Sequence, residues 1–168
     1  MCIRDRLRFA EIGVFEGRSF CWLMDWFGLN ATGHAVDPAP QENFPLNVAR
    51  FGNRVHQHAS LQDTAAVPGV NDPTLPADGS LSFVYVDGDH SSSAVFDDAL
   101  TAHHLLKPGG IVAFDDYGHY DSVRKAVDHW WEIDGDKYTR LRSDDVQLWA
   151  KKKCPHRREF LRTSDCSG

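Results

Sequence analysis

The feature that most constrains the fold is a regular alternation between short apolar runs and segments with helical periodicity. Five runs read as strands: Leu7–Val14, Gly33–Val36, Arg54–His58, Leu81–Val86 and Ile111–Phe114. Four intervening or following segments space apolar side chains as a helix does: Arg18–Leu29, Pro45–Phe51, Ser91–Leu106 and Ser122–Ile133. This alternation predicts a mostly parallel sheet with helices on both faces.

Two further apolar runs, Tyr138–Leu141 and Val146–Ala150, read as a final pair of strands forming an antiparallel edge. We therefore predict an α/β fold with a doubly wound, Rossmann-like sheet of about seven strands, in which Leu7–Val14 and Leu81–Val86 are parallel neighbours. Lys107–Gly110 has the composition of a tight turn. Three prolines predict a surface excursion, with at most a short helix, over 62–79.

The length of 168 residues fits one domain, which we place at 7–152. Residues 1–6 resemble translated sequencing-adapter read-through, so we treat them as an artefactual start. The first strand pattern begins at once after them, and we expect N-terminal helices of the natural protein to be missing. Residues 153–168 form a polar, basic tail that we expect to be disordered.

Composition excludes several classes of partner. The formal net charge is −6, which disfavours nucleic acid and anionic membranes. No apolar run approaches the roughly 18 residues that a membrane span needs. The four cysteines are far apart and suggest reduced thiols, so we expect a cytoplasmic protein. The sequence leaves open whether the chain forms a homo-oligomer.

A first group of polar and glycine residues follows the first two strands. Gly13 and Gly17 lie between the first strand and the first helix, where glycines let the backbone approach a ligand and the helix offers free N–H groups. Asp37 ends the second strand, where a carboxylate can accept both ribose hydroxyls. Each signal alone could be a glycine turn or an aspartate cap. Together with Glu11, they favour a nucleoside site.

A second group is acidic. Asp87, Asp89 and His90 follow the fourth strand, and Asp115 and Asp116 follow the fifth. Because neighbouring strands lie about 5 Å apart, these carboxylates repel unless they are protonated or bind a cation. Such oxygen-rich sites suit magnesium, calcium or manganese. The alternative is a helix cap followed by a solvated turn.

In these motifs the chain resembles the class I S-adenosylmethionine (SAM) methyltransferases. It shares Glu-x-Gly-x-x-x-Gly-x-Ser at Glu11–Ser19 and an acid after the second strand. In Tyr85–Ser91, Lys107–Gly110 and Asp115–Tyr117 it resembles a small family that includes catechol, caffeoyl-CoA and macrolide-sugar O-methyltransferases. The resemblance covers roughly Leu7–Lys152, and its specificity lies in the ordered combination of motifs.

The resemblance implies a SAM site. Its residues would be Glu11, Gly13, Phe15, Gly17, Ser19, Asp37, Ala59, Ser60 and Asp87. The two glycines would pass beside the methionine part, Ser19 would donate to its carboxylate, and Asp37 would hold the ribose. Ala59 and Ser60 would lie at the adenine, although many class I enzymes have an acid near Ser60 and this chain does not.

The resemblance also implies a divalent cation, magnesium above all, on Asp87, Asp115 and Asp116. His90 occupies the place of a catalytic lysine, so we predict it as the general base, with Asp89 as the rival. The predicted activity is metal-assisted methyl transfer to a hydroxyl of a small molecule such as a catechol or sugar diol. Two alternatives are an NAD-dependent oxidoreductase of similar topology and a non-catalytic, truncated nucleoside-binding domain.

Overall fold

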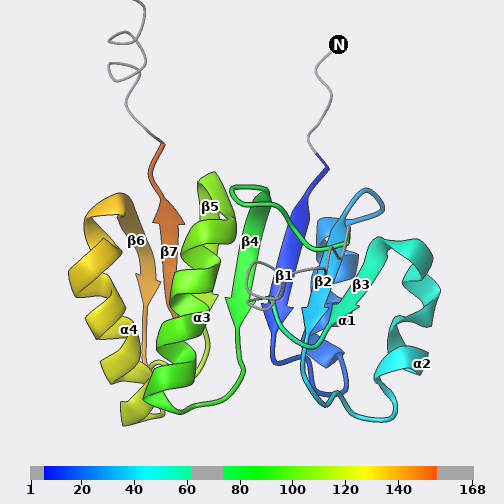
Figure 1. Ribbon diagram of the computed structural model, residues 1–168, viewed down its shortest axis with the longest axis horizontal. Coiled ribbons are helices and arrows are strands. Elements are labelled where there is room, and N and C mark those ends of the chain that lie inside the picture. Colours follow the sequence, from blue (N-terminus) through cyan, green and yellow to red (C-terminus); the bar gives the residue numbers. More distant parts are fainter. Residues whose placement is uncertain (1–5, 62–73, 155–168) are drawn as a thin grey trace, which may run out of the picture.

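The predicted strands form one mixed sheet in a computed structural model, which describes residues 6–61 and 74–154 (Figure 1). The strands are β1 (Arg8–Ile12), β2 (Thr32–Val36), β3 (Val55–His58), β4 (Leu81–Val86), β5 (Leu106–Phe114), β6 (Tyr138–Ser143) and β7 (Leu148–Lys152). The helices are α1 (Arg18–Phe27), α2 (Phe44–Val48), α3 (Ser92–Leu105) and α4 (Asp121–Asp134), with 3-10 turns η1 (Ala49–Arg54) and η2 (Gly135–Lys137).

The strand order is β3-β2-β1-β4-β5-β7-β6. β1 pairs in parallel with both β2 and β4, which confirms the predicted neighbours. β7 runs antiparallel between β5 and β6. The chain winds outward from β1 to β3 and then returns to β4, so the order reverses between β1 and β4. Ligands of open α/β sheets bind outside the strand ends at such a reversal.

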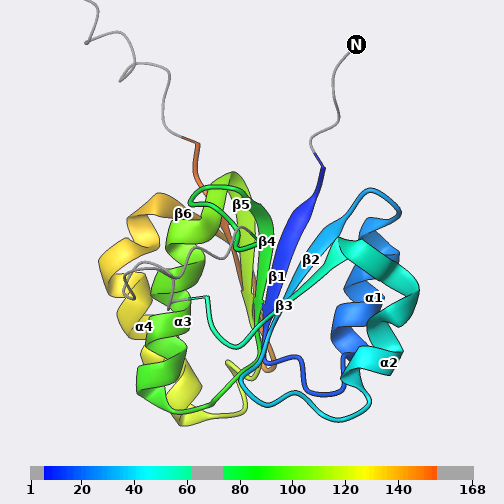
Figure 2. The same ribbon diagram turned by 45° about the vertical axis from the view of Figure 1, so that its right-hand side comes forward.

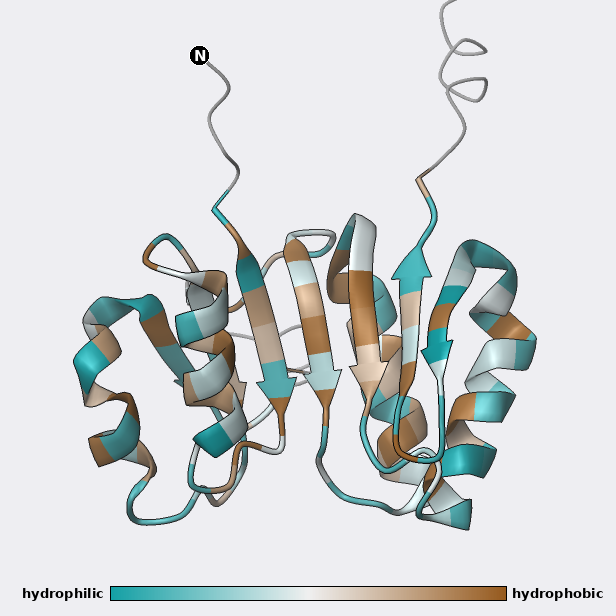
Figure 3. Ribbon diagram, turned by 180° about the vertical axis from the view of Figure 1, so that it is seen from behind, coloured by the Kyte–Doolittle hydropathy of each residue, from teal (hydrophilic) through white to brown (hydrophobic). Residues whose placement is uncertain are grey.

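Helices cover both faces of the sheet and make three layers. α1 and α2 lie on one face, and α3 and α4 lie on the other (Figure 2). Alternate strand residues point to opposite faces. Phe9 and Phe83 therefore belong to the core beneath α1, whereas Ala10 and Val84 belong to the core beneath α3 and α4. Apolar colour dominates the central strands in Figure 3.

The predicted turn at Lys107–Gly110 is instead an irregular part of β5. The pairing of β4 with β5 jumps from Leu81–Leu106 to Phe83–Ile111, so β5 carries extra residues there. Gly109 has a φ of 81°, a left-handed conformation that lets the strand bulge and then rejoin the sheet.

The predictions for 1–6, 62–79 and 153–168 lie largely outside the described residues. Within the described part, none of the helices is long and apolar enough to cross a bilayer.

Candidate active site

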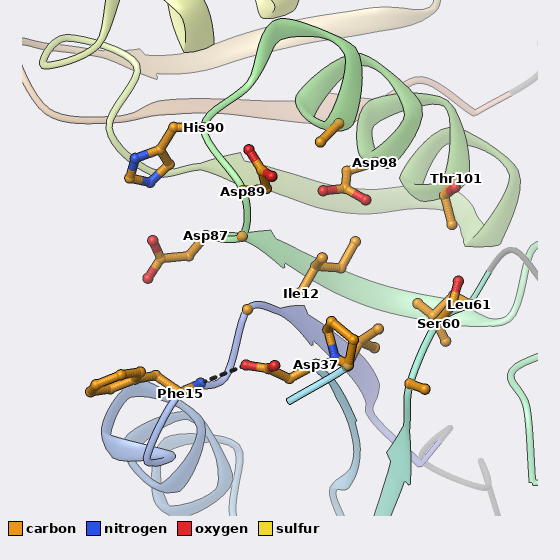
Figure 4. Close-up of a pocket in the computed structure, with 16 residues that line it drawn as sticks. Ile12, Phe15, Asp37, Ser60, Leu61, Asp87, Asp89, His90, Asp98 and Thr101 are labelled. Carbon is orange, nitrogen blue, oxygen red and sulfur yellow. Dashed lines mark hydrogen bonds between the residues drawn. The ribbon is translucent and has the colours of Figure 1, made fainter. Parts of the chain in front are cut away.

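A pocket of about 670 Å³ lies at the carboxyl ends of β1 to β4, against α3 (Figure 4). It is at the reversal of strand order, where the fold predicts a ligand. Its lining comprises Ile12, Gly13, Phe15, Val36, Asp37, Pro38, Ala59, Ser60, Leu61, Asp87, Gly88, Asp89, His90, Ala94, Asp98 and Thr101. Six of the nine residues predicted for the cofactor are among them, and Glu11, Gly17 and Ser19 are not.

The turn after β1 requires glycine where it crosses the turn after β4. Gly13 has a φ of 87°, and a Cβ there would lie 2.0 Å from the carbonyl oxygen of Asp87. Gly17 has a φ of 85° and is the N-cap of α1. Phe15 between them also has a positive φ, 48°, which is unusual for a bulky side chain. The turn thus brings the two backbones together at the pocket.

Asp37 is held in place by two backbone N–H groups. Phe15 donates to its Oδ2 at 3.0 Å, and Ala39 donates to its Oδ1 at 2.9 Å. Because a carboxylate oxygen can accept more than one hydrogen bond, both oxygens can still accept from a ligand. Asp37 is therefore an oriented acceptor at the edge of the pocket, as its predicted role requires.

Glu11 lies completely buried beneath this turn. Burial raises its pKa to about 8, with the charges of Asp87 and Asp115 acting in the same direction; the Ser19 hydroxyl, which donates to Oε1, opposes the shift. Among the described residues, Oε2 of Glu11 has no hydrogen-bond partner. Ser19 here contacts Glu11, and its predicted contact with a cofactor carboxylate stays a prediction.

At the other end of the pocket, side chains from two loops converge. Donor atoms of Asp87, His90 and Asp116 all lie within 4.8 Å of one another. The Nε2 of His90 is 3.1 Å from Oδ2 of Asp116. Burial, followed by the charges of Asp115 and Asp116, raises the pKa of Asp87 to about 7. Such a cluster can bind a cation, which would relieve the repulsion.

The side chain of Asp115 has other partners than that of Asp116. Its Oδ1 accepts a hydrogen bond of 2.7 Å from the side-chain amide of Gln147, whose own oxygen accepts one of 2.9 Å from the indole of Trp149. The Gln147 amide also lies 3.2 Å from the Tyr85 hydroxyl. The predicted ligands Asp87 and Asp116 thus come together with His90, and Asp115 is bonded to Gln147, the residue before β7.

Asp116 and His90 have further partners in the loop before α4. Asp116 has a positive φ of 56°, and its Oδ1 is 3.0 Å from Nδ1 of His119. The His90 ring packs against Tyr120 with centroids 4.3 Å apart.

Asp89, the rival candidate for the base, instead accepts a hydrogen bond from the Ser91 N–H at 2.6 Å, which lowers the pKa of Asp89 and makes it a weaker base.

Several site residues were not predicted from the sequence. His119 and Gln147 lie far along the chain, and no motif singles them out. Asp98 and Thr101 line the pocket from α3. Together with Ala94 they stand at positions i, i+4 and i+7, so their shared helical face was the available signal.

A family comparison agrees with this geometry. Residues 10–117, more than half of the chain, match the family described as a methyltransferase domain. The chain belongs to this family, and its fold and strand order are those of the class I SAM-dependent methyltransferases.

A curated relative is an uncharacterised protein of Acanthamoeba polyphaga mimivirus, 31% identical over 126 residues. The match covers 70% of this chain and 54% of the viral protein, so the chain spans about half the length of that relative.

Two solved structures illustrate the fold. The O-methyltransferase TomG of Streptomyces achromogenes, solved with SAM and involved in tomaymycin synthesis, has a TM-score of 0.64 and 21% identity, covering 90% of this chain and 75% of its own. A protein of Clostridium thermocellum described as a putative rRNA-methylase has a TM-score of 0.69 and 14% identity, covering 90% and 89%. These similarities show the fold, and neither identifies the methyl acceptor.

Proposed function

We propose that this protein binds SAM and transfers its methyl group to a hydroxyl of a small molecule, with the help of a divalent cation. One observation carries the proposal. The same pocket is lined by Asp37, an oriented acceptor suited to ribose hydroxyls, and by Asp87 and His90, which belong to the cluster with Asp116. The resemblance to O-methyltransferases supports oxygen as the acceptor atom, with a catechol or sugar diol as the substrate class.

The residues around Asp37 fit the cofactor. Asp37 would accept from the ribose hydroxyls, and Ala59 and Ser60 would border the adenine. Gly13 lets the backbone pass close to the bound molecule. The buried Oε2 of Glu11 has no partner among the described residues. An ammonium group such as that of methionine, bound near it, would favour the ionised form of Glu11, in which Oε2 can accept a hydrogen bond. These side chains would place the methyl group toward the acidic cluster.

Asp87 and Asp116 fit a divalent cation, and both proposed ligand sets contain them. The third ligand would be Asp115, as the resemblance implies, or His90, as the grouping of donor atoms favours. An all-oxygen set suits magnesium or manganese, whereas a histidine ligand favours a transition metal. When bound, the cation would orient a substrate oxygen and lower its pKa.

His90 would remove the proton of the acceptor hydroxyl if it is not a ligand. It faces Asp116 and Tyr120 and lines the pocket, so it can reach a molecule bound there. A neutral imidazole is a suitable base near neutral pH. Much of the acceleration would come from holding the hydroxyl and the methyl group in line.

The first test is calorimetry with SAM and with NAD, each with and without magnesium or manganese. We expect SAM to bind and NAD not to bind. NAD binding in the absence of SAM binding would replace the proposal with an oxidoreductase. SAM binding without turnover over a screen of catechols and sugar diols would favour a non-catalytic domain.

The second test is a manganese titration followed by electron paramagnetic resonance. Asp116→Asn should weaken manganese binding under either ligand set, and wild-type turnover should cease after chelation. His90→Gln weakens manganese binding only if His90 is the third ligand, and Asp115→Asn does so only if Asp115 is. Turnover that survives thorough chelation would refute the metal part of the proposal.

A further inference from the structure

Asp98 is an acid of the pocket lining that lies outside the acidic cluster and has no partner in the described chain. It lies on α3 between Asp89 and Thr101, with Asp37 and Phe15 on the opposite side of the pocket (Figure 4). No hydrogen bond or ion pair to its carboxylate forms within residues 6–61 and 74–154. Burial, then the charges of Asp97 and Asp89, raises its pKa to about 6.

The position of the carboxylate is closely defined. Its Oδ2 lies 3.6 Å from the point where a side chain at Gly88 would begin. Gly88 follows β4, so the carboxylate lies over the end of that strand, and the absence of a side chain at Gly88 leaves room beside it. A partly buried acceptor without a donor is costly, and a ligand that brings an N–H group would remove that cost.

The wall formed by α3 offers acceptors. The Thr101 hydroxyl donates to the carbonyl oxygen of Asp97 at 2.9 Å, which leaves its oxygen lone pairs for a ligand. Asp98 is ionised above its pKa and then only accepts. This wall lines the same pocket as Ala59 and Ser60, which follow β3.

We infer that Asp98 recognises the amino edge of the adenine, accepting a hydrogen bond from its exocyclic amine. The inference rests on the proposed function, since it takes the ribose to lie at Asp37. The exocyclic amine is at the edge of the purine away from the ribose, so an acceptor for it belongs on the wall opposite Asp37. Asp98 supplies this acceptor from α3.

This contact discriminates between purines. Deamination of adenine replaces the amine with a carbonyl oxygen, which presents lone pairs to the carboxylate and is repelled. An asparagine at the same position can turn its oxygen to an amine or its NH₂ to a carbonyl. It therefore accepts both purines.

The experiment compares S-adenosylhomocysteine with its deaminated form, S-inosylhomocysteine, by calorimetry at pH 8. The wild type should bind the adenine form at least tenfold more tightly. Asp98→Asn should reduce this preference at least tenfold, and Asp98→Ala should also reduce it. The matched control is Asp97→Asn, an exposed neighbour on α3 outside the pocket lining, which should keep the wild-type preference.

The outcomes separate the two proposals. If the wild type binds S-adenosylhomocysteine and folded Asp98 variants keep the full preference, Asp98 does not read the purine and the proposed function stands. An equal loss for both ligands would likewise overturn the inference, because Asp98 would then contact another part of the molecule. If the wild type binds neither ligand, the proposed function fails first.

Discussion

Replacing Glu11 with glutamine should make the stability of this protein less sensitive to pH. Glu11 is completely buried, and its pKa is raised from an ordinary 4.5 to about 8. In the folded protein it therefore keeps its proton at neutral pH, whereas in the unfolded chain it loses it. Glutamine resembles the protonated acid, because its oxygen can still accept from the Ser19 hydroxyl.

The sign and size of this pH effect follow from the difference in proton binding between the folded and unfolded states. Between about pH 4.5 and 8 the folded state binds one more proton at Glu11 than the unfolded state, so rising pH lowers the free energy of unfolding. Each pH unit is worth about 1.4 kcal/mol, which gives an upper limit of about 5 kcal/mol over this window. Relative to the wild type, Glu11→Gln should gain about 3–4 kcal/mol between pH 5 and 8, and little more above pH 8.

The assay is urea unfolding followed by circular dichroism at pH values from 5 to 9, with SAM and metal absent. Comparing two proteins at each pH cancels the groups that they share. Glu42→Gln, at an exposed position, is the matched control and should track the wild type. Parallel curves for Glu11→Gln and the wild type across this range would refute the burial argument.

Three further outcomes are expected. Asp37→Ala should weaken SAM binding by about 1–3 kcal/mol in calorimetry, the usual cost of losing a charged hydrogen bond, and unchanged affinity in a folded variant would remove Asp37 from the site. Gly13→Ala should cost about 3–5 kcal/mol in urea unfolding, because its Cβ would lie 2.0 Å from a carbonyl oxygen, whereas Gly79→Ala, also at positive φ but in open space, should cost about 1–2 kcal/mol. Once an acceptor is known, His90→Gln should lower turnover by about 10²–10⁴ with cofactor affinity nearly unchanged; if Asp89→Asn loses turnover and His90→Gln does not, Asp89 is the base.

The sequence by itself determined the elements and their layers. The strand predicted at Leu81–Val86 has those bounds, and the helix predicted from Arg18 begins there. Glycine spacing after the first strand predicted a turn that approaches a ligand, and Gly13 and Asp37 do border the pocket. These signals are local, since periodicity and left-handed backbone act over a few residues.

Only the tertiary structure decided which side chains meet. β7 inserts between β5 and β6, and this brings Gln147 to Asp115 across 32 residues of sequence. Nothing local indicates which of the last two strands borders β5, so the sequence could not show that Asp115 has a partner. The burial of Glu11 and the place of Asp98 over the end of β4 have the same origin. Each depends on contacts between segments that are distant in the sequence, and these contacts form only when the whole sheet packs against its helices.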